Sequence, residues 1–244
     1  MLDFIQAGDA SLIAFKNTDR RLEVIAKKQD ILTEIEQYYN LATTSILFVG
    51  FNSFIFADLT KTIAITCASD SVLLYLKSQN IKFQHIPEAE LINYRKQFNI
   101  VVAVDEFFTY AESDEAQRNL VTVLCNVATN CIITTLRDYK NQDYRDREFS
   151  QPAVVNNAGD KTIFLEYHNW DQQDRTSWTS NTYSIDQTKN KMITYGPFAR
   201  RTMYFKQLAK FSIDAGATSF LVHKNLMYKG LTRKSYEHVI SVKF

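Results

Sequence analysis

The stretch Phe98–Asp105, which reads FNIVVAVD, decides the fold. Its centre is an unbroken apolar run, which is the pattern of a strand buried on both faces of a parallel sheet. Shorter runs of the same kind occupy Ser45–Gly50, Thr62–Cys67 and Asn130–Leu136. Helical patterns separate these runs, and strands that alternate with helices indicate βαβ units. The sequence therefore predicts an α/β fold with a mostly parallel sheet.

Two helices and one weaker strand are predicted between these runs. The helices cover Asp70–Gln79 and Asp114–Ala128, and the strand covers Lys82–Ile86. Ser113 precedes the second helix by one residue, and a serine in this place commonly accepts a hydrogen bond from the first turn. Residues up to about Asn40 have helical spacing of their apolar side chains, so the chain is expected to open with helix.

The pattern changes after residue 136. Lys161–Trp170 and Thr179–Ile185 alternate apolar and polar residues, which indicates antiparallel strands, and Lys189–Tyr195 can pair back on them. A helix is expected over Arg201–Ala215. Two closing strands, Thr218–Lys224 and His238–Lys243, complete a sheet of seven strands with helices on both faces.

We expect one domain over residues 1–244. Its expected parts are an N-terminal helical segment (1–44), the βα units (45–136), an antiparallel insertion (150–197), and a C-terminal helix with a strand pair (198–244).

Composition excludes several classes of protein. With 28 basic and 27 acidic residues, the chain of 244 residues has no global charge that would draw it to nucleic acid or membrane. Its three cysteines are odd in number, which disfavours a disulfide framework and favours a reducing, cytoplasmic location. No apolar run is long enough to span a membrane, and no signal peptide is visible. The low Gly and Pro content suits an AT-rich genome and is compatible with a viral source, in which case the location would be the host cytoplasm.

Basic residues are concentrated near the C-terminus. Residues 200–244 contain nine Lys and Arg side chains but only Asp214 and Glu237 as acids. A solvated surface explains this bias most simply. A contact with a polyanion through residues 200–234 is the alternative, and it would weaken as salt rises.

The order of elements resembles that of the class I S-adenosylmethionine-dependent methyltransferases, over about residues 30–244. In that family the first strand ends in a Gly-rich loop, because the backbone must approach the cofactor closely. The matching segment here is Val49–Phe54, which keeps Gly50 but has the bulky Phe51 and Phe54. The family's second strand ends in an acidic residue that binds the ribose. Cys67 stands there instead, and a thiol is a poor acceptor.

The fourth strand matches the family best. Asp105 and Glu106 follow it at the carboxyl edge of the sheet, where open α/β sheets bind ligands. The third unit of the family usually supplies an acidic group near the adenine, and Glu88 or Glu90 could stand there. The resemblance implies S-adenosyl-L-methionine as cofactor, and the residues expected to bind it are Gly50, Phe51, Asn52, Ser53, Cys67, Ser69, Asp70, Glu88, Asp105, Glu106 and Phe107.

The methyl acceptor is not identified by any motif. A base is needed only for acceptors that lose a proton, and Asp105 and His168 are the candidates. A Lys-Asp-Lys-Glu set for a ribose oxygen can be drawn through Lys28, Asp105, Lys140 and Glu166, but such a set arises easily by chance. The histidines lack the spacing of a metal site, and no Gly-x-Gly-x-x-Gly for a nicotinamide cofactor follows the first strand.

A second hypothesis therefore stays open beside the enzyme. Phe51, Phe54 and Cys67 also suit a methyltransferase-like module that has lost cofactor binding and serves as a structural or interaction domain, in an oligomer or complex. The same fold can host either role.

Overall fold

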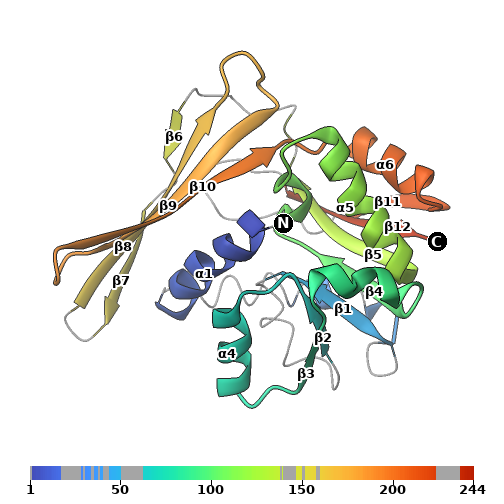
Figure 1. Cartoon of the computed structure of the whole chain (residues 1–244), viewed down its shortest axis with the longest axis horizontal. Helices are drawn as coiled ribbons and strands as arrows, with labels where there is room; N and C mark the ends of the chain where they lie inside the picture. The colour runs from blue at the N-terminus through green and yellow to red at the C-terminus, as the bar shows by residue number, and fades with distance from the viewer. Residues whose placement is uncertain are drawn as a thin grey trace.

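A computed structural model shows two β-sheets joined by one continuous chain (Figure 1). The structure describes residues 2–17, 29, 31–33, 36–37, 39–40, 44–50, 63–137, 139, 147–149, 152–157, 160–223 and 237–244. No helix among them is long and apolar enough to cross a membrane.

The first sheet has seven strands in the order β11-β12-β5-β4-β1-β2-β3. The strands β1 (Ile46–Val49), β2 (Ile63–Thr66), β3 (Phe83–His85), β4 (Phe98–Ala103) and β5 (Ala128–Arg137) are parallel to one another. The C-terminal strand β12 (Glu237–Lys243) lies antiparallel to both β5 and β11 (Ser219–His223). The predicted fold class is confirmed: a mostly parallel sheet with a C-terminal antiparallel pair.

Each face of this sheet has its own apolar core, because alternate side chains of a strand point to opposite faces. Leu47 and Val49 pack on one face with the helices α5 (Asp114–Val127) and α6 (Phe205–Asp214). Ile46 and Phe48 pack on the other with the helix α4 (Asp70–Ser78). Burial on both faces is what the unbroken apolar runs predicted.

Serine side chains begin two of these helices. Ser113 Oγ accepts a hydrogen bond of 3.1 Å from the amide of Ala116, so the predicted N-cap is confirmed. Ser69 Oγ accepts one of 3.3 Å from the amide of Val72 at the start of α4. Short 3₁₀ helices, η2 (Glu88–Tyr94) and η3 (Phe107–Thr109), follow β3 and β4.

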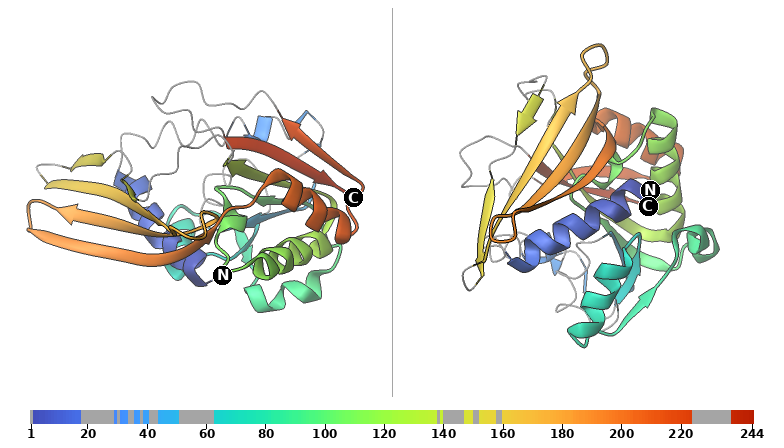
Figure 2. Two further views of the ribbon diagram at one scale, coloured as in Figure 1. Left: turned by 90° about the horizontal axis from the view of Figure 1, so that it is seen from above. Right: turned by 60° about the vertical axis from the view of Figure 1, so that its left-hand side comes forward.

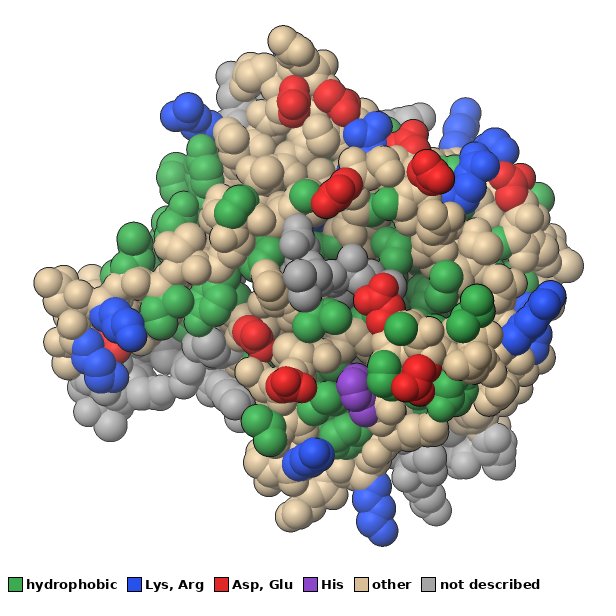
Figure 3. All heavy atoms as spheres, viewed as in Figure 1, with side chains coloured by type: hydrophobic (Ala, Val, Ile, Leu, Met, Phe, Trp, Pro, Cys, Tyr) green, Lys and Arg blue, Asp and Glu red, His purple; other side chains and the backbone are tan. Residues whose placement is uncertain are grey.

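The second sheet is antiparallel and has five strands. They are β6 (Arg147–Phe149), β7 (Ala153–Asn157), β8 (Asp160–Trp170), β9 (Ser177–Asp186) and β10 (Lys191–Arg201). The helix α1 (Leu2–Asn17) lies between the two sheets and contacts β10 and α4 (Figure 2). Apolar side chains gather along this second sheet in Figure 3, and Phe149 and Met192 are among its exposed ones.

The second sheet extends beyond the predicted insertion of residues 150–197. Strand β10 continues through Arg201, and α6 begins only at Phe205. The predicted start of this helix at Arg201 is therefore wrong. As a result, Arg200 and Arg201 lie in a strand, where successive side chains point to opposite faces.

Candidate functional site

The carboxyl edge of the parallel sheet has an unusual backbone. The chain leaves β1, β2 and β4 through left-handed residues: Gly50 at φ 89°, Cys67 at φ 54°, and Asp105 and Glu106 at φ 59° and 56°. These three strands are neighbours, and the Gly50 amide donates to the carbonyl of Thr66 at 2.8 Å. Left-handed non-glycine residues are uncommon, and such strain is concentrated at functional sites.

The residues that were predicted to bind the cofactor at this edge differ in their exposure to solvent. Gly50 is buried at the end of β1. Asp70 and Glu88 are exposed, on the first turns of α4 and η2. The Ser69 hydroxyl donates to Asp9 Oδ1 at 2.6 Å, which ties α1 to the start of α4. Phe51, Asn52 and Ser53 lie outside the described residues, as does Phe54.

Cys67 is a neutral thiol in this structure. It is 3% exposed, and burial followed by the neighbouring Glu88 carboxylate raises its pKa to about 12. The thiol therefore supplies no negative charge at neutral pH. The effect of Glu88 on Cys67 also shows that the Glu88 carboxylate lies near the end of β2.

Glu106 is the centre of a buried polar cluster. Its Oε1 accepts a hydrogen bond of 2.5 Å from the Tyr139 hydroxyl. Its Oε2 lies 3.3 Å from Arg137 Nη2 and 3.6 Å from Arg200 Nη2. Three side chains thus hold this carboxylate, and they come from β5, from the residues after it and from β10. Glu106 therefore joins the two sheets.

Arg200 is the more deeply buried of the two arginines in this cluster and is 6% exposed. Its Nε and Nη2 donate to Thr109 Oγ1 at 3.0 and 2.7 Å. The guanidinium lies 3.7 Å from the centre of the Tyr110 ring and 5.3 Å from that of Trp178, within cation–π range. Burial raises the pKa of Tyr110 to about 12, so this phenol stays protonated at neutral pH.

The predicted base His168 lies beside the same cluster. Its Nε2 is 3.1 Å from Glu166 Oε1. Burial would raise the pKa of Glu166, but His168 and the charges of Arg200 and Arg137 lower it to about 2. After burial, the charges of Glu166, Glu106 and Asp105 also raise the pKa of Tyr110, whereas the charge of Arg200 lowers it.

Other predicted residues have different positions. Phe107 is 1% exposed and belongs to the apolar core, so only its backbone is available to a cofactor. Of the Lys-Asp-Lys-Glu set, Lys28 and Lys140 lie outside the described residues. Sequence reasoning missed Arg137, Tyr139 and Thr109, and it placed Arg200 on the surface. In the structure Arg200 pairs with Trp178 of β9 and is buried, after an irregularity in β10 that shifts the register of the two strands.

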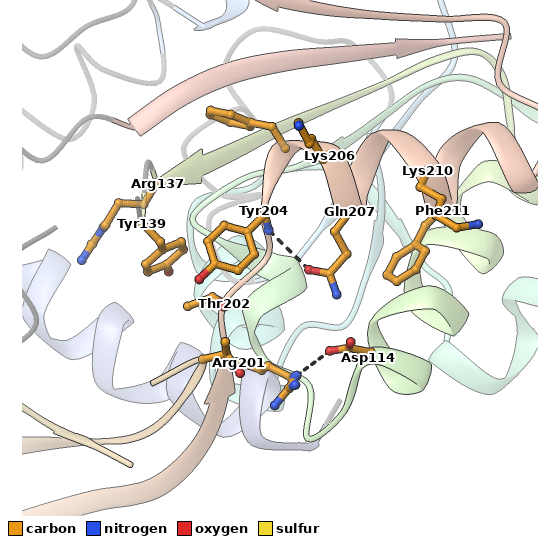
Figure 4. A pocket seen from close by; sticks show the side chains of 12 residues that line it. Asp114, Arg137, Tyr139, Arg201, Thr202, Tyr204, Lys206, Gln207, Lys210 and Phe211 are labelled. Carbon is orange, nitrogen blue, oxygen red and sulfur yellow. Dashed lines mark hydrogen bonds and ion pairs between the residues drawn. The ribbon is translucent and has the colours of Figure 1, made fainter. Parts of the chain in front are cut away.

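A cavity of about 830 Å³ adjoins the cluster (Figure 4). Arg137 and Tyr139 form one side of it, and the first turns of α6 form the other. Because Tyr139 also contacts Glu106, the cavity lies one side chain away from the carboxyl edge of the sheet.

No protein-family model matches the chain, and no curated protein matches its sequence. Solved structures do match over nearly its whole length. DesVI from Streptomyces venezuelae is 10% identical, with a TM-score of 0.67 over 90% of this chain and 92% of that one. The sugar N-methyltransferase KedS8 from a Streptoalloteichus species is 11% identical, with a TM-score of 0.62 over 89% of this chain and 87% of that one.

CalS10 from Micromonospora echinaspora, an amino pentose methyltransferase with bound S-adenosylmethionine, is 8% identical. Its TM-score is 0.59 over 97% of this chain and 90% of that one. At these identities the likeness concerns the fold. The chain has the fold of the class I S-adenosylmethionine-dependent methyltransferases.

Proposed function

We propose that the protein is an S-adenosylmethionine-dependent methyltransferase. The observation that supports this most is the left-handed backbone at the ends of β1, β2 and β4, on the edge where open α/β sheets bind ligands. These three strands are adjacent in the seven-stranded sheet, in the order β4-β1-β2.

The described residues fit such a cofactor. Gly50 has no Cβ where the backbone leaves β1 at φ 89°. Glu88 and Asp70 offer exposed carboxylates that can accept hydrogen bonds from ribose hydroxyls or the adenine amine, a role that the neutral Cys67 cannot fill. The bound cofactor supplies an activated methyl group.

The chain's own residues would handle the proton of an acceptor. For an acceptor that loses a proton, the candidate bases are His168, which lies 3.1 Å from the ionised Glu166, and Asp105, which follows the central strand. The cluster of Glu106, Arg200 and Tyr139 is a positioning element, since it fixes the second sheet against the carboxyl edge.

One observation favours the second candidate function, an interaction module without cofactor binding. Cys67 is buried and neutral where the resemblance implies an acidic residue. In that case, neither S-adenosylmethionine nor its demethylated product would bind.

Calorimetric titration with both compounds separates the two functions. We expect binding to the wild-type protein and roughly tenfold weaker binding to Gly50→Ala, because a Cβ would occupy the space of the cofactor and strain a left-handed residue by about 1 kcal/mol. Gly216→Ala is the matched control: Gly216 is also left-handed, at φ 96°, but lies in open space after α6. Its affinity should equal that of the wild type.

Thermal unfolding would show that both glycine variants remain folded. An absence of heat from either compound on folded wild-type protein would reject the enzyme and favour the interaction module.

A further inference from the structure

The cavity beside α6 has the size of a small-molecule site. Its volume of about 830 Å³ lies within the range of about 300–1,000 Å³ that such sites usually have. Figure 4 shows that its walls come from segments far apart in sequence, including the start of α5, the end of β10 and α6.

Aromatic side chains provide the apolar part of the cavity. Tyr139, Tyr204, Phe205 and Phe211 line it. Tyr139 belongs to an apolar cluster with Trp170 and Trp178, and Tyr204 packs against this cluster. The rings of Trp170 and Trp178 are stacked, with their centroids 4.3 Å apart. Such walls suit a flat or branched apolar body rather than a strongly hydrated one.

Positive charge gathers at the same cavity. Lys206 and Lys210 line it from α6, and Arg137 and Arg201 line it from the strand ends. Three of these cations are paired with carboxylates: Arg201 with Asp114 at 2.6 Å, Lys210 with Asp214 at 2.9 Å, and Arg137 with Glu106 at 3.3 Å. Lys206 makes no ion pair with any side chain in the described part of the chain. The N-terminal turn of α6, with its favourable dipole, also borders the cavity.

Thr202 adds an independent sign of a ligand. It lines the cavity and is 2% exposed, and its hydroxyl has no hydrogen-bond partner among the described residues. Its backbone is fixed, since the amide donates to Thr176 and the carbonyl accepts from Gln117 Nε2 at 3.0 Å. A buried hydroxyl without a partner is costly, and a bound acceptor would satisfy it.

We propose that this cavity binds a small amphiphilic anion, a molecule with an aromatic or branched apolar body and one carboxylate, phosphate or sulfonate group. The body packs on the aromatic walls and the anionic group accepts from the Thr202 hydroxyl, while Lys206 adds positive charge to the lining of the same cavity. This site is additional to the proposed methyl transfer, because the anion would bind to the cavity without S-adenosylmethionine.

Ligand-observed NMR with naphthalene-1-sulfonate tests the site, with naphthalene-1-sulfonamide as its neutral twin. At low salt we expect saturable binding of the sulfonate, at least fivefold tighter than that of the sulfonamide. Lys206→Glu should weaken sulfonate binding roughly fivefold. Thr202→Val removes the hydroxyl at constant shape and should weaken it roughly tenfold.

Two control variants match these changes. Lys77→Glu reverses an exposed charge on α4, outside the cavity. Ser212→Ala removes another buried hydroxyl without a described partner, on α6 itself but not in the cavity lining. Both should bind the sulfonate as the wild type does.

Equal affinity for sulfonate and sulfonamide would overturn the proposal, as would equal effects of Thr202→Val and Ser212→Ala. A parallel titration with the demethylated cofactor keeps the two proposals apart. Cofactor binding without sulfonate binding rejects the anion site alone, and sulfonate binding without cofactor binding supports the anion site while rejecting the methyltransferase.

Discussion

The two sheets of this protein differ in how they are buried and in what they bring to the candidate site. In the parallel sheet, β1 is buried along its whole length and β4 at every residue except Asn99. In the antiparallel sheet, β9 is buried only at Trp178, Ser180 and Ser184, on one face. The parallel sheet shapes the backbone of the carboxyl edge, whereas the antiparallel sheet brings charged side chains to it.

The largest expected effect is a loss of stability on substitution of one of two adjacent arginines of β10. Arg200 faces inward and is one partner of a buried ion pair, whereas Arg201 faces the partly exposed Asp114 and Asp174. Arg200→Leu should lower the free energy of unfolding by about 3 kcal/mol, because it leaves the Glu106 carboxylate buried with fewer partners. Arg201→Leu should lower it by at most about 1 kcal/mol. Urea denaturation measures both.

Equal losses in the two arginine variants would mean that the cluster around Glu106 does not join the sheets as described. Glu106→Gln in the Arg200→Leu background sharpens the test. Since the neutral amide no longer needs the guanidinium, it should recover part of the lost stability.

The role of the parallel sheet in cofactor binding is tested by measuring the affinity for the demethylated cofactor. Glu88→Gln should weaken binding of the demethylated cofactor roughly tenfold, because it replaces a charged acceptor with a neutral one. Glu90→Gln is the comparison variant, since Glu90 is the other exposed acid of the same 3₁₀ helix and the alternative candidate for the group near the adenine. Calorimetry in which both variants bind equally well would remove Glu88 from the site.

A smaller effect, in the antiparallel sheet, depends on pH. The pKa of Glu166 is lowered to about 2, so its ionised form stabilises the folded state above its ordinary pKa of about 4.5. This stability should be lost as pH falls from about 4.5 towards 2. Because 42% of the side chain is exposed, solvent limits the effect to about 1 kcal/mol.

Unfolding of Glu166→Gln at pH 6 and pH 3 isolates this contribution from that of Asp174, whose pKa is also about 2. The variant should be less stable than the wild type at pH 6, and the difference should be clearly smaller at pH 3, where part of the contribution has been lost. A stability difference that stays constant between the two pH values would contradict the ion pair with His168.

The parallel sheet was predictable because its strands are buried on both faces. Unbroken apolar runs such as Ile46–Val49 and Ile100–Val104 have few other structures available to them. Ser113 was likewise predictable as an N-cap, since its interaction is local in sequence. The edge residues Asp105 and Glu106 followed from the place where the central strand ends.

The polar cluster was not predictable, because it depends on a register that a local pattern does not show. Strand β10 contains an irregularity between Tyr195 and Phe198, which shifts its pairing with β9. Such a bulge interrupts the alternation of side chains. Pro197 lies within this irregularity, and a proline has no backbone N–H to donate to a neighbouring strand. The inward direction of Arg200, and its contacts with Glu106 and Thr109, emerged only from the three-dimensional pairing.

Hydrogen exchange with and without the demethylated cofactor tests the central claim most directly, because it locates binding on the chain. The account predicts slower exchange in peptides that contain Gly50, Cys67–Asp70, Glu88 and Asp105–Phe107, at the ends of β1, β2, β3 and β4. Peptides from the far end of the β9–β10 hairpin, around Met192, should exchange as before. Protection confined to the antiparallel sheet, or no protection at saturating ligand, would contradict a cofactor site at the carboxyl edge.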